Sequence, residues 1–127
     1  MVNRSKAKGT NAETKIVNYL KDAGRDARRV ALKGKRDEGD IHVEHPNWNE
    51  DKIVLEVKAG RQTQNVNRKT MEDWLAQTRK EAHAAEGTGY LVVARFGCSV
   101  KDYHVWSSDG RRFWYLDVFV REIGREV

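Results

Sequence analysis

Cysteine is almost absent from this chain of 127 residues, in which Cys98 is the single example. One cysteine cannot form an intrachain disulfide, and it cannot build a thiolate metal site without other ligands. Long apolar runs are missing too: no stretch approaches the roughly 20 residues needed to cross a bilayer. The first residues lack the apolar segment of a secretory signal. We therefore expect a cytoplasmic protein with no membrane segment.

Internal repeats, low-complexity tracts and interdomain linkers are also absent from the sequence. A length of 127 residues suits one compact domain with its own hydrophobic core. We expect that domain to span residues 1–127. Residues 1–9 are basic and polar, which is typical of a mobile terminal arm.

Charge is distributed unevenly along the chain, whose net charge is +5. Residues 1–36 contain 11 lysines and arginines and 3 acids, whereas residues 37–60 contain 7 acids and 2 lysines. Basic segments can bind a polyanion, and a concentrated acidic segment can bind a cation beside it. Charged residues also simply solvate protein surfaces, so the pattern by itself leaves both interpretations open.

Hydrophobic periodicity and turn residues predict an α/β fold. Helices are expected at about 11–23, with Thr10 as N-cap, and at about 71–85, with Thr70 as N-cap. Strands are expected at 27–32, 41–45, 52–58, 90–95, 103–106 and 113–120. The elements therefore follow the order helix, three strands, helix, three strands, which predicts a mixed central β-sheet flanked by helices.

Side chains that can bind a metal meet at one edge of this predicted sheet. Alternation along strand 52–58 places Glu56 and Lys58 on the same side, in a strand otherwise suited to burial. Asp40 stands where a glycine-containing loop enters the preceding strand, so pairing of the two strands brings it near Glu56. Carboxylates suit Mg²⁺ or Mn²⁺, which also bind phosphate. Taken alone, Glu56 and Lys58 would fit a cross-strand surface ion pair better than a metal site.

Glu13 is a further candidate for this site. It projects near the middle of the apolar arc that Ile16, Val17 and Leu20 define on the first helix, a position that a surface glutamate avoids. It also stands three residues after Thr10, as in a capping box. A capping role and a role at the metal both fit this position.

The order and spacing of these residues resemble a nuclease motif. Gly39-Asp40-Ile41 followed by Leu55-Glu56-Val57-Lys58 is similar to the core motif of the PD-(D/E)XK nuclease superfamily. With Lys8-Gly9, Glu13 and Arg28-Arg29 added, the chain resembles the archaeal-type Holliday junction resolvases and their bacteriophage-encoded relatives over about residues 5–95. The resemblance implies a restriction-endonuclease-like core and a Mg²⁺-dependent homodimer that cleaves four-way DNA junctions. A phage-encoded member would act in the cytoplasm of a bacterial host.

The same resemblance implies a role for each motif residue. Asp40 and Glu56 would bind the cation, with the Val57 carbonyl as a further ligand. Glu13 would bind the cation directly or through water. Lys58 would orient the attacking water or stabilise developing charge. The products would carry 5′-phosphate and 3′-hydroxyl ends.

Two positions depart from the family pattern. Gly39 replaces the usual proline before the motif aspartate, which leaves that ligand intact. Loop 32–39 has no clear match for a serine often found there, so the junction-specific contacts of this loop have no counterpart. Gln77 resembles a glutamine often near such sites, although an exposed helix position suits it equally.

Basic side chains flank the predicted site along the sequence and would bind DNA phosphates. Such contacts provide affinity without reading the base sequence. The candidates lie on the terminal arm, on the first strand, in the loop after it and beyond the metal site: Arg4, Lys6, Lys8, Arg28, Arg29, Lys33, Lys35, Arg36, Arg61, Arg68 and Lys69.

Two other metal arrangements compete with this one. The run His-Val-Glu-His at 42–45 resembles part of a zinc site, but its histidines fall on opposite faces of the strand and no cysteine assists. Asp37 and Glu38 compete with Asp40 for the cation. They stand in the loop rather than at the start of the strand, so Asp40 is the preferred ligand.

Segment 113–120 is apolar on both faces, so it fits either a buried strand or a surface that packs against a second subunit. A two-fold dimer would match the symmetry of a four-way junction.

The sequence leaves three functions open: a junction endonuclease, a nuclease of the same superfamily for other branched, nicked or linear DNA, and a non-catalytic module that binds nucleic acid. The intact set of Asp40, Glu56 and Lys58 favours the two nucleases.

Overall fold

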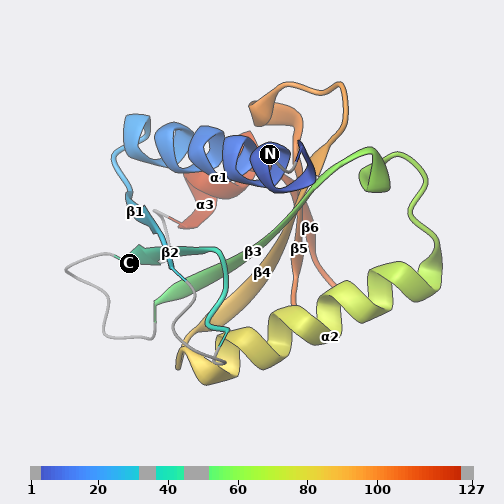
Figure 1. Ribbon diagram of the computed structural model, residues 1–127. Coiled ribbons are helices and arrows are strands. Elements are labelled where there is room, and N and C mark those ends of the chain that lie inside the picture. The colour runs from blue at the N-terminus through green and yellow to red at the C-terminus, as the bar shows by residue number, and fades with distance from the viewer. Residues whose placement is uncertain (1–3, 32–36, 45–51, 124–127) are drawn as a thin grey trace.

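A six-stranded mixed sheet lies between helices on both of its faces (Figure 1), as the sequence predicted. The computed structural model describes residues 4–31, 37–44 and 52–123, and it describes side chains from residue 11 onward. None of the helices in these ranges is long and apolar enough to cross a membrane. The helices and strands, with two short 3-10 helices, are α1 (Arg4–Asp22), β1 (Asp26–Arg29), β2 (Ile41–Glu44), β3 (Ile53–Gly60), η1 (Arg61–Thr63), α2 (Arg68–Ala84), β4 (Thr88–Arg95), η2 (Val100–Asp102), β5 (His104–Ser107), β6 (Phe113–Tyr115) and α3 (Leu116–Ile123).

The strands lie side by side in chain order, from β1 to β6. The first three form an antiparallel meander, and β4 then pairs in parallel with β3. This parallel pair requires a crossover, which α2 provides. The last three strands are antiparallel. The meander, the crossover helix and the closing hairpin all match the sequence prediction.

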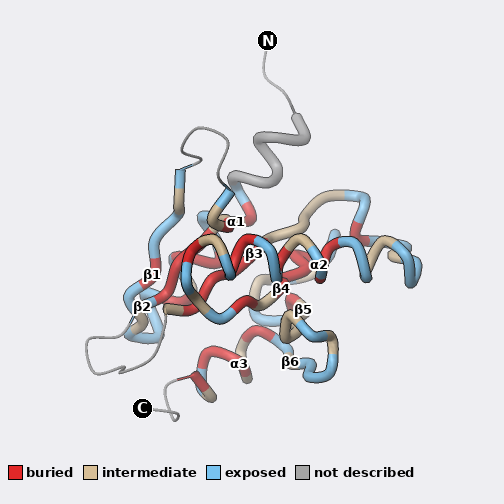
Figure 2. Tube along the Cα trace, turned by 90° about the horizontal axis from the view of Figure 1, so that it is seen from below, coloured by how far each residue is buried: buried red, intermediate tan, exposed pale blue. Residues whose placement is uncertain are grey.

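The two faces of the sheet have separate cores. Ile53 and Leu55 of β3 face α1 and α3, where they pack with Ile16 and Leu20. Val54 of β3 faces the other way and packs under α2. Figure 2 shows buried segments along β3 and β4, the two central strands. Because residues 53–56 of β3 are buried, a polar side chain there loses contact with water, and leaving it without a partner is costly.

Helix α1 begins at Arg4, whereas the sequence predicted a start near Asn11 with Thr10 as the N-cap. Both of these predictions are wrong, since Thr10 lies inside the helix. The predicted arm at residues 1–9 overlaps the helix from residue 4, and residues 1–3 lie outside the described part of the chain. Alanine, lysine and arginine in this segment favour the helical state, which outweighs the cost of Gly9.

Helix α2 begins at Arg68 rather than at Met71, and its N-cap is Asn67 rather than the predicted Thr70. The Asn67 side chain accepts a hydrogen bond from the Thr70 backbone N–H at 2.8 Å. Asparagine and threonine both cap helices, so composition alone did not separate the two positions. From this start, α2 runs across β3 and β4 and places Trp74 and Leu75 against the sheet.

The C-terminal segment corrects the predicted strand at 113–120. Strand β6 ends at Tyr115, and Leu116–Ile123 forms helix α3. Leu116, Phe119, Val120 and Ile123 are all buried, with the i, i+3, i+4, i+7 spacing of one helix face. A continuous apolar run hides this periodicity, because it fits a two-sided strand equally well.

Phe119 is expected to be a major contributor to stability. Its ring is 1% exposed and contacts the Tyr90 ring, with 4.9 Å between centroids. Phe119→Ala should lower the free energy of unfolding by about 3–5 kcal/mol, measured by urea denaturation. Phe113→Ala is the matched control, since Phe113 is 39% exposed on β6 and should cost about 1 kcal/mol or less. Equal losses in the two variants would contradict the packing of α3 on the sheet.

Candidate active site

Asp40 and Glu56 lie next to each other where β2 starts beside the middle of β3. Asp40 stands one residue before β2, and its backbone N–H donates to the Leu55 carbonyl at 3.0 Å. The Asp40 side chain turns toward β3, where Oδ2 accepts a hydrogen bond from the Val57 N–H at 2.8 Å. The structure therefore brings Asp40 to the Glu56–Lys58 segment, as the strand pairing predicted.

Glu56 and Lys58 project from β3 toward α2, away from the core under α1. Lys58 Nζ donates to Gln77 Oε1 of α2 at 2.8 Å and lies 3.6 Å from Glu56 Oε1. The ammonium group also lies 5.9 Å from the centroid of the Trp74 ring. Lys58 is thus held on three sides by β3 and α2, so its position is defined. This arrangement differs from an exposed ion pair because the Glu56 side chain is only 6% exposed.

Gln77 and Glu81 bring α2 into the site. Gln77 Nε2 donates to Glu81 Oε1 at 2.7 Å and lies 3.5 Å from Glu56 Oε1. Of the two interpretations for Gln77, the structure supports a position at the site. Sequence reasoning missed Glu81, although a signal was present: at about 100° per residue, Glu81 projects about 20° from Trp74, at the edge of the arc that Trp74, Thr78, Ala82 and Ala85 define. The same argument had singled out Glu13.

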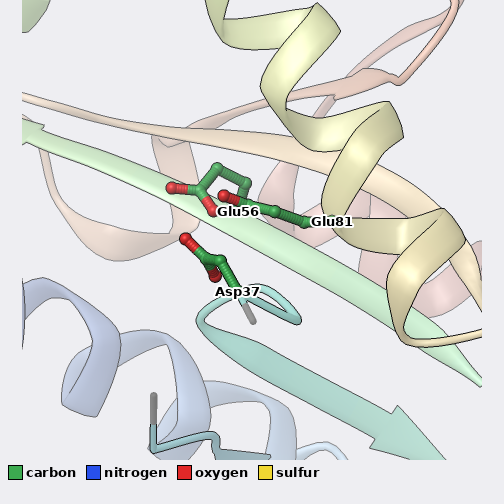
Figure 3. A group of neighbouring side chains, drawn as sticks. All are labelled: Asp37, Glu56 and Glu81. Atoms are coloured by element: carbon green, nitrogen blue, oxygen red, sulfur yellow. The ribbon is translucent and has the colours of Figure 1, made fainter. Parts of the chain in front are cut away.

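Asp37, Glu56 and Glu81 form a compact acidic cluster (Figure 3). One ligand atom of each residue lies within 4.8 Å of the other two. Among the described residues, this is the one group of three or more acids, histidines or cysteines whose ligand atoms lie this close together, and it differs from the predicted set of Glu13, Asp40 and Glu56. The sequence had favoured Asp40 over Asp37 as a metal ligand, yet Asp37 also lies close to Glu56. Glu56 therefore stands between two groups of acids.

Glu13 extends the row of acids on the other side of Asp40. Burial, the charge of Asp40 and contact with its carboxyl raise the pKa of Glu13 to about 7, and Arg29 acts in the opposite direction. Arg29 Nη2 lies 3.1 Å from Glu13 Oε2. The predicted capping role for Glu13 fails because α1 begins at Arg4, while its position beside Asp40 is present. Asp40 therefore lies between Glu13 of α1 and Glu56 of β3.

The electrostatics of the cluster are unfavourable without a cation. Burial, together with the neighbouring carboxyls of Glu81 and Asp40, raises the pKa of Glu56 to about 11, and Lys58 only partly opposes this shift. Burial also raises the pKa of Glu81. Oε2 of Glu56 and Oε2 of Glu81 are buried without a hydrogen-bond partner. Buried acids with unpaired oxygens fit a divalent cation, which prefers oxygen ligands and offsets their charge.

The backbone of the loop before β2 requires glycine at position 39. Gly39 has φ of +92°, which the proline ring cannot adopt, and its N–H donates to Asp37 Oδ1 at 3.0 Å. A Cβ atom at this position would lie 2.5 Å from Val54 Cγ1. The loop that carries Asp37 and Asp40 therefore depends on glycine at this position.

The zinc alternative at 42–45 is not supported by the described part of this run. The buried His42 ring uses Nε2 to contact the Glu38 carbonyl at 2.7 Å. Glu44 is exposed and lies 4.0 Å from Arg28, and His45 lies outside the described residues. His42 and Glu44 thus engage different partners. The His42 contact holds the loop in which both candidate aspartates stand.

The candidate DNA-binding residues are described only in part. Arg28 and Arg29 are exposed on β1, at the edge of the sheet, and Arg61, Arg68 and Lys69 are exposed after β3. Of the remaining candidates, the side chains of Arg4, Lys6 and Lys8 are not described, and Lys33, Lys35 and Arg36 lie outside the described residues. Of the two arginines on β1, Arg29 contacts Glu13 of the site, whereas Arg28 lies 4.0 Å from Glu44.

No protein-family model matches the chain, and no curated protein matches its sequence. Among solved structures, the chain is similar to Hjc, a Holliday junction resolvase from the archaeal hyperthermophile Archaeoglobus fulgidus. The two share 18% sequence identity with a TM-score of 0.55, over 80% of this chain and 78% of that one. The likeness to Hjc confirms the fold that the motif resemblance predicted.

Proposed function

We propose that this protein is a divalent-metal-dependent endonuclease that cleaves DNA at four-way junctions. The observation that carries this proposal is the convergence of Asp40, Glu56 and Lys58 beside the buried, unpartnered Oε2 of Glu56. Two acids and a fixed ammonium group, on a fold shared with a junction resolvase, are the parts that metal-assisted phosphodiester hydrolysis requires.

The residues that would hold the cation are Asp40, Glu56 and the Val57 carbonyl, with Glu13 directly or through water. Oxygen donors and an excess of buried negative charge suit Mg²⁺, and Mn²⁺ can substitute. A cation held there neutralises charge on a phosphodiester and lowers the pKa of water. The hydrogen bond from Val57 N–H to Asp40 Oδ2 keeps the Asp40 side chain beside the β3 backbone. Asp40 is thereby oriented as a ligand in the absence of a cation.

Lys58 supplies the positive group that faces the scissile phosphate or the attacking water. Its Nζ donates to Gln77 Oε1, and Gln77 is itself held by Glu81, so the ammonium group is positioned through α2. A preorganised charge of this kind stabilises negative charge as it develops in the transition state. Gln77 accordingly acts as a positioning residue, because it orients Lys58 and Glu81 without reaching the substrate.

DNA binding would depend on phosphate contacts from basic residues around the site. Arg28 and Arg29 stand at the β1 edge, while Arg61, Arg68 and Lys69 lie beyond the far end of β3. Arg4, Lys6, Lys8, Lys33, Lys35 and Arg36 complete the proposed set. Contacts of this type position a duplex without reading its sequence, which suits recognition of DNA shape. A homodimer would present two sites to the two strands of a junction.

A labelled four-way junction, a matched linear duplex and a single strand, each tested with and without Mg²⁺, distinguish the possible functions. Paired symmetric nicks near the crossover support junction resolution. Equal cleavage of all substrates supports a nuclease for other branched, nicked or linear DNA, the second candidate. Binding without product in either Mg²⁺ or Mn²⁺ would overturn the nuclease proposal and support a non-catalytic binding module.

Asp40→Asn is expected to lower cleavage by about 10²-fold to 10³-fold or more while junction binding persists, because it removes a cation ligand and keeps the side-chain shape. Gel electrophoresis of the products and a mobility-shift assay measure the two properties. Asp22→Asn is the matched control, since Asp22 is exposed at the end of α1 and its loss removes the same charge. Normal cleavage by Asp40→Asn would show that the metal assignment is wrong.

Without divalent cations, the free energy of unfolding is expected to fall as the pH rises from about 5 to about 9. The unfolded chain releases the Glu56 proton near the ordinary pKa of 4.5, whereas the folded chain retains it up to a pKa of about 11. Unfolding therefore releases a proton across this range. Glu56→Gln should be more stable than the wild-type protein at pH 9 by about 1–3 kcal/mol, measured by urea denaturation.

Mg²⁺ should raise the stability of the wild-type protein and have little effect on Glu56→Gln, because the variant lacks the Glu56 carboxylate ligand. Glu72→Gln is the control, since Glu72 is exposed on α2 and should keep the wild-type response. Parallel pH profiles for the wild type and Glu56→Gln would contradict the raised pKa of Glu56.

A further inference from the structure

We propose that Asp37, Glu56 and Glu81 form a second divalent-cation site, on the α2 side of the sheet. The three residues come from the loop before β2, from β3 and from α2. The site would take a hard cation such as Mg²⁺, Mn²⁺ or Ca²⁺, because all three ligands are carboxylates. The inference rests on the proposed function only in that Glu56 is shared with the proposed Asp40 site.

The spacing of the three carboxylates suits one ion. Figure 3 shows the side chains directed toward one another, and one oxygen of each lies within 4.8 Å of the others. Metal–oxygen distances of about 2.1–2.6 Å place two ligands of the same ion about 3–5 Å apart, depending on the angle between them. The cluster therefore needs little movement to become a coordination shell.

Two buried carboxylate oxygens lie without a hydrogen-bond partner among the described residues. Glu56 and Glu81 are 5% and 2% exposed, and Oε2 of each has no hydrogen-bond partner. The other oxygen of Glu81 accepts from Gln77 at 2.7 Å, and the other oxygen of Glu56 lies 3.6 Å from Lys58. In each glutamate, Oε1 lies near a polar group of another residue, and no hydrogen-bond donor reaches the buried Oε2 while the acids are ionised. Burying such oxygens without a partner is costly, and a cation between them removes the cost.

The loop that carries Asp37 is held in place by its own contacts. Asp37 Oδ1 accepts the Gly39 N–H at 3.0 Å, and the buried His42 ring contacts the Glu38 carbonyl at 2.7 Å. Gly39 turns the chain with φ of +92°, which brings Asp37 toward β3 and Asp40 toward Val57. The loop thereby contributes one acid to each side of Glu56.

Manganese binding to the full chain tests this inference. Mn²⁺ titration followed by electron paramagnetic resonance should find two bound ions per wild-type chain. Glu81→Gln and Asp37→Asn should each lose one of them or weaken it at least tenfold while retaining the other. Asp40→Asn should show the complementary loss. Glu72→Gln, an exposed acid on α2, is the matched control and should bind as the wild type does.

The outcomes separate this inference from the proposed function. Two ions that persist in both Glu81→Gln and Asp37→Asn would overturn the second site. One ion that depends on Asp40 alone would also overturn it and leave the nuclease proposal standing. A single ion that depends on Glu81 and Asp37, but not on Asp40, would support the site and count against the proposed catalytic ligands. Asp37 is exposed, so its variant keeps the test valid if Glu81→Gln fails to fold.

Discussion

The burial of Glu56 is the constraint on which the rest of this site depends. A carboxylate on a central strand, covered by α2 and flanked by Asp40 and Glu81, cannot be ionised without a counter-charge. Lys58 supplies part of that charge, and its 3.6 Å separation from Glu56 Oε1 leaves Oε2 unpaired. The negative charge of an ionised Glu56 is therefore only partly neutralised within the protein, and a divalent cation would neutralise the rest.

The charged residues around Glu56 stand on regular secondary structure rather than on loops. Glu56 and Lys58 belong to β3, which pairs with β2 on one side and β4 on the other, and Gln77 and Glu81 belong to α2. The parallel pairing of β3 with β4 requires the α2 crossover, and that crossover carries Gln77 to Lys58. The topology and the site are thus linked, because the helix that connects the parallel strands β3 and β4 also positions the Lys58 ammonium group.

The likeness to the archaeal resolvase persists at 18% identity, which shows how little of the sequence the fold requires. Buried positions on both faces of β3 and β4 tolerate exchange among apolar residues if volume and pattern are kept. Gly39 illustrates a local change within that frame. Its φ of +92° excludes proline, and its N–H donates to Asp37, the loop residue that lies near Glu56.

The sequence by itself determined the order of most elements, the pairing of β2 with β3 and the convergence of Asp40, Glu56 and Lys58. These features follow from the alternation of side chains along each strand and from the turn residues between strands. Both are local patterns that can be read from neighbouring positions in the sequence. Tertiary structure decided that segment 113–120 ends in a helix, and it brought Asp37 and Glu81 together beside Glu56. An apolar run suits a strand or a helix until packing selects one, and a glutamate on α2 meets β3 only when the crossover folds back.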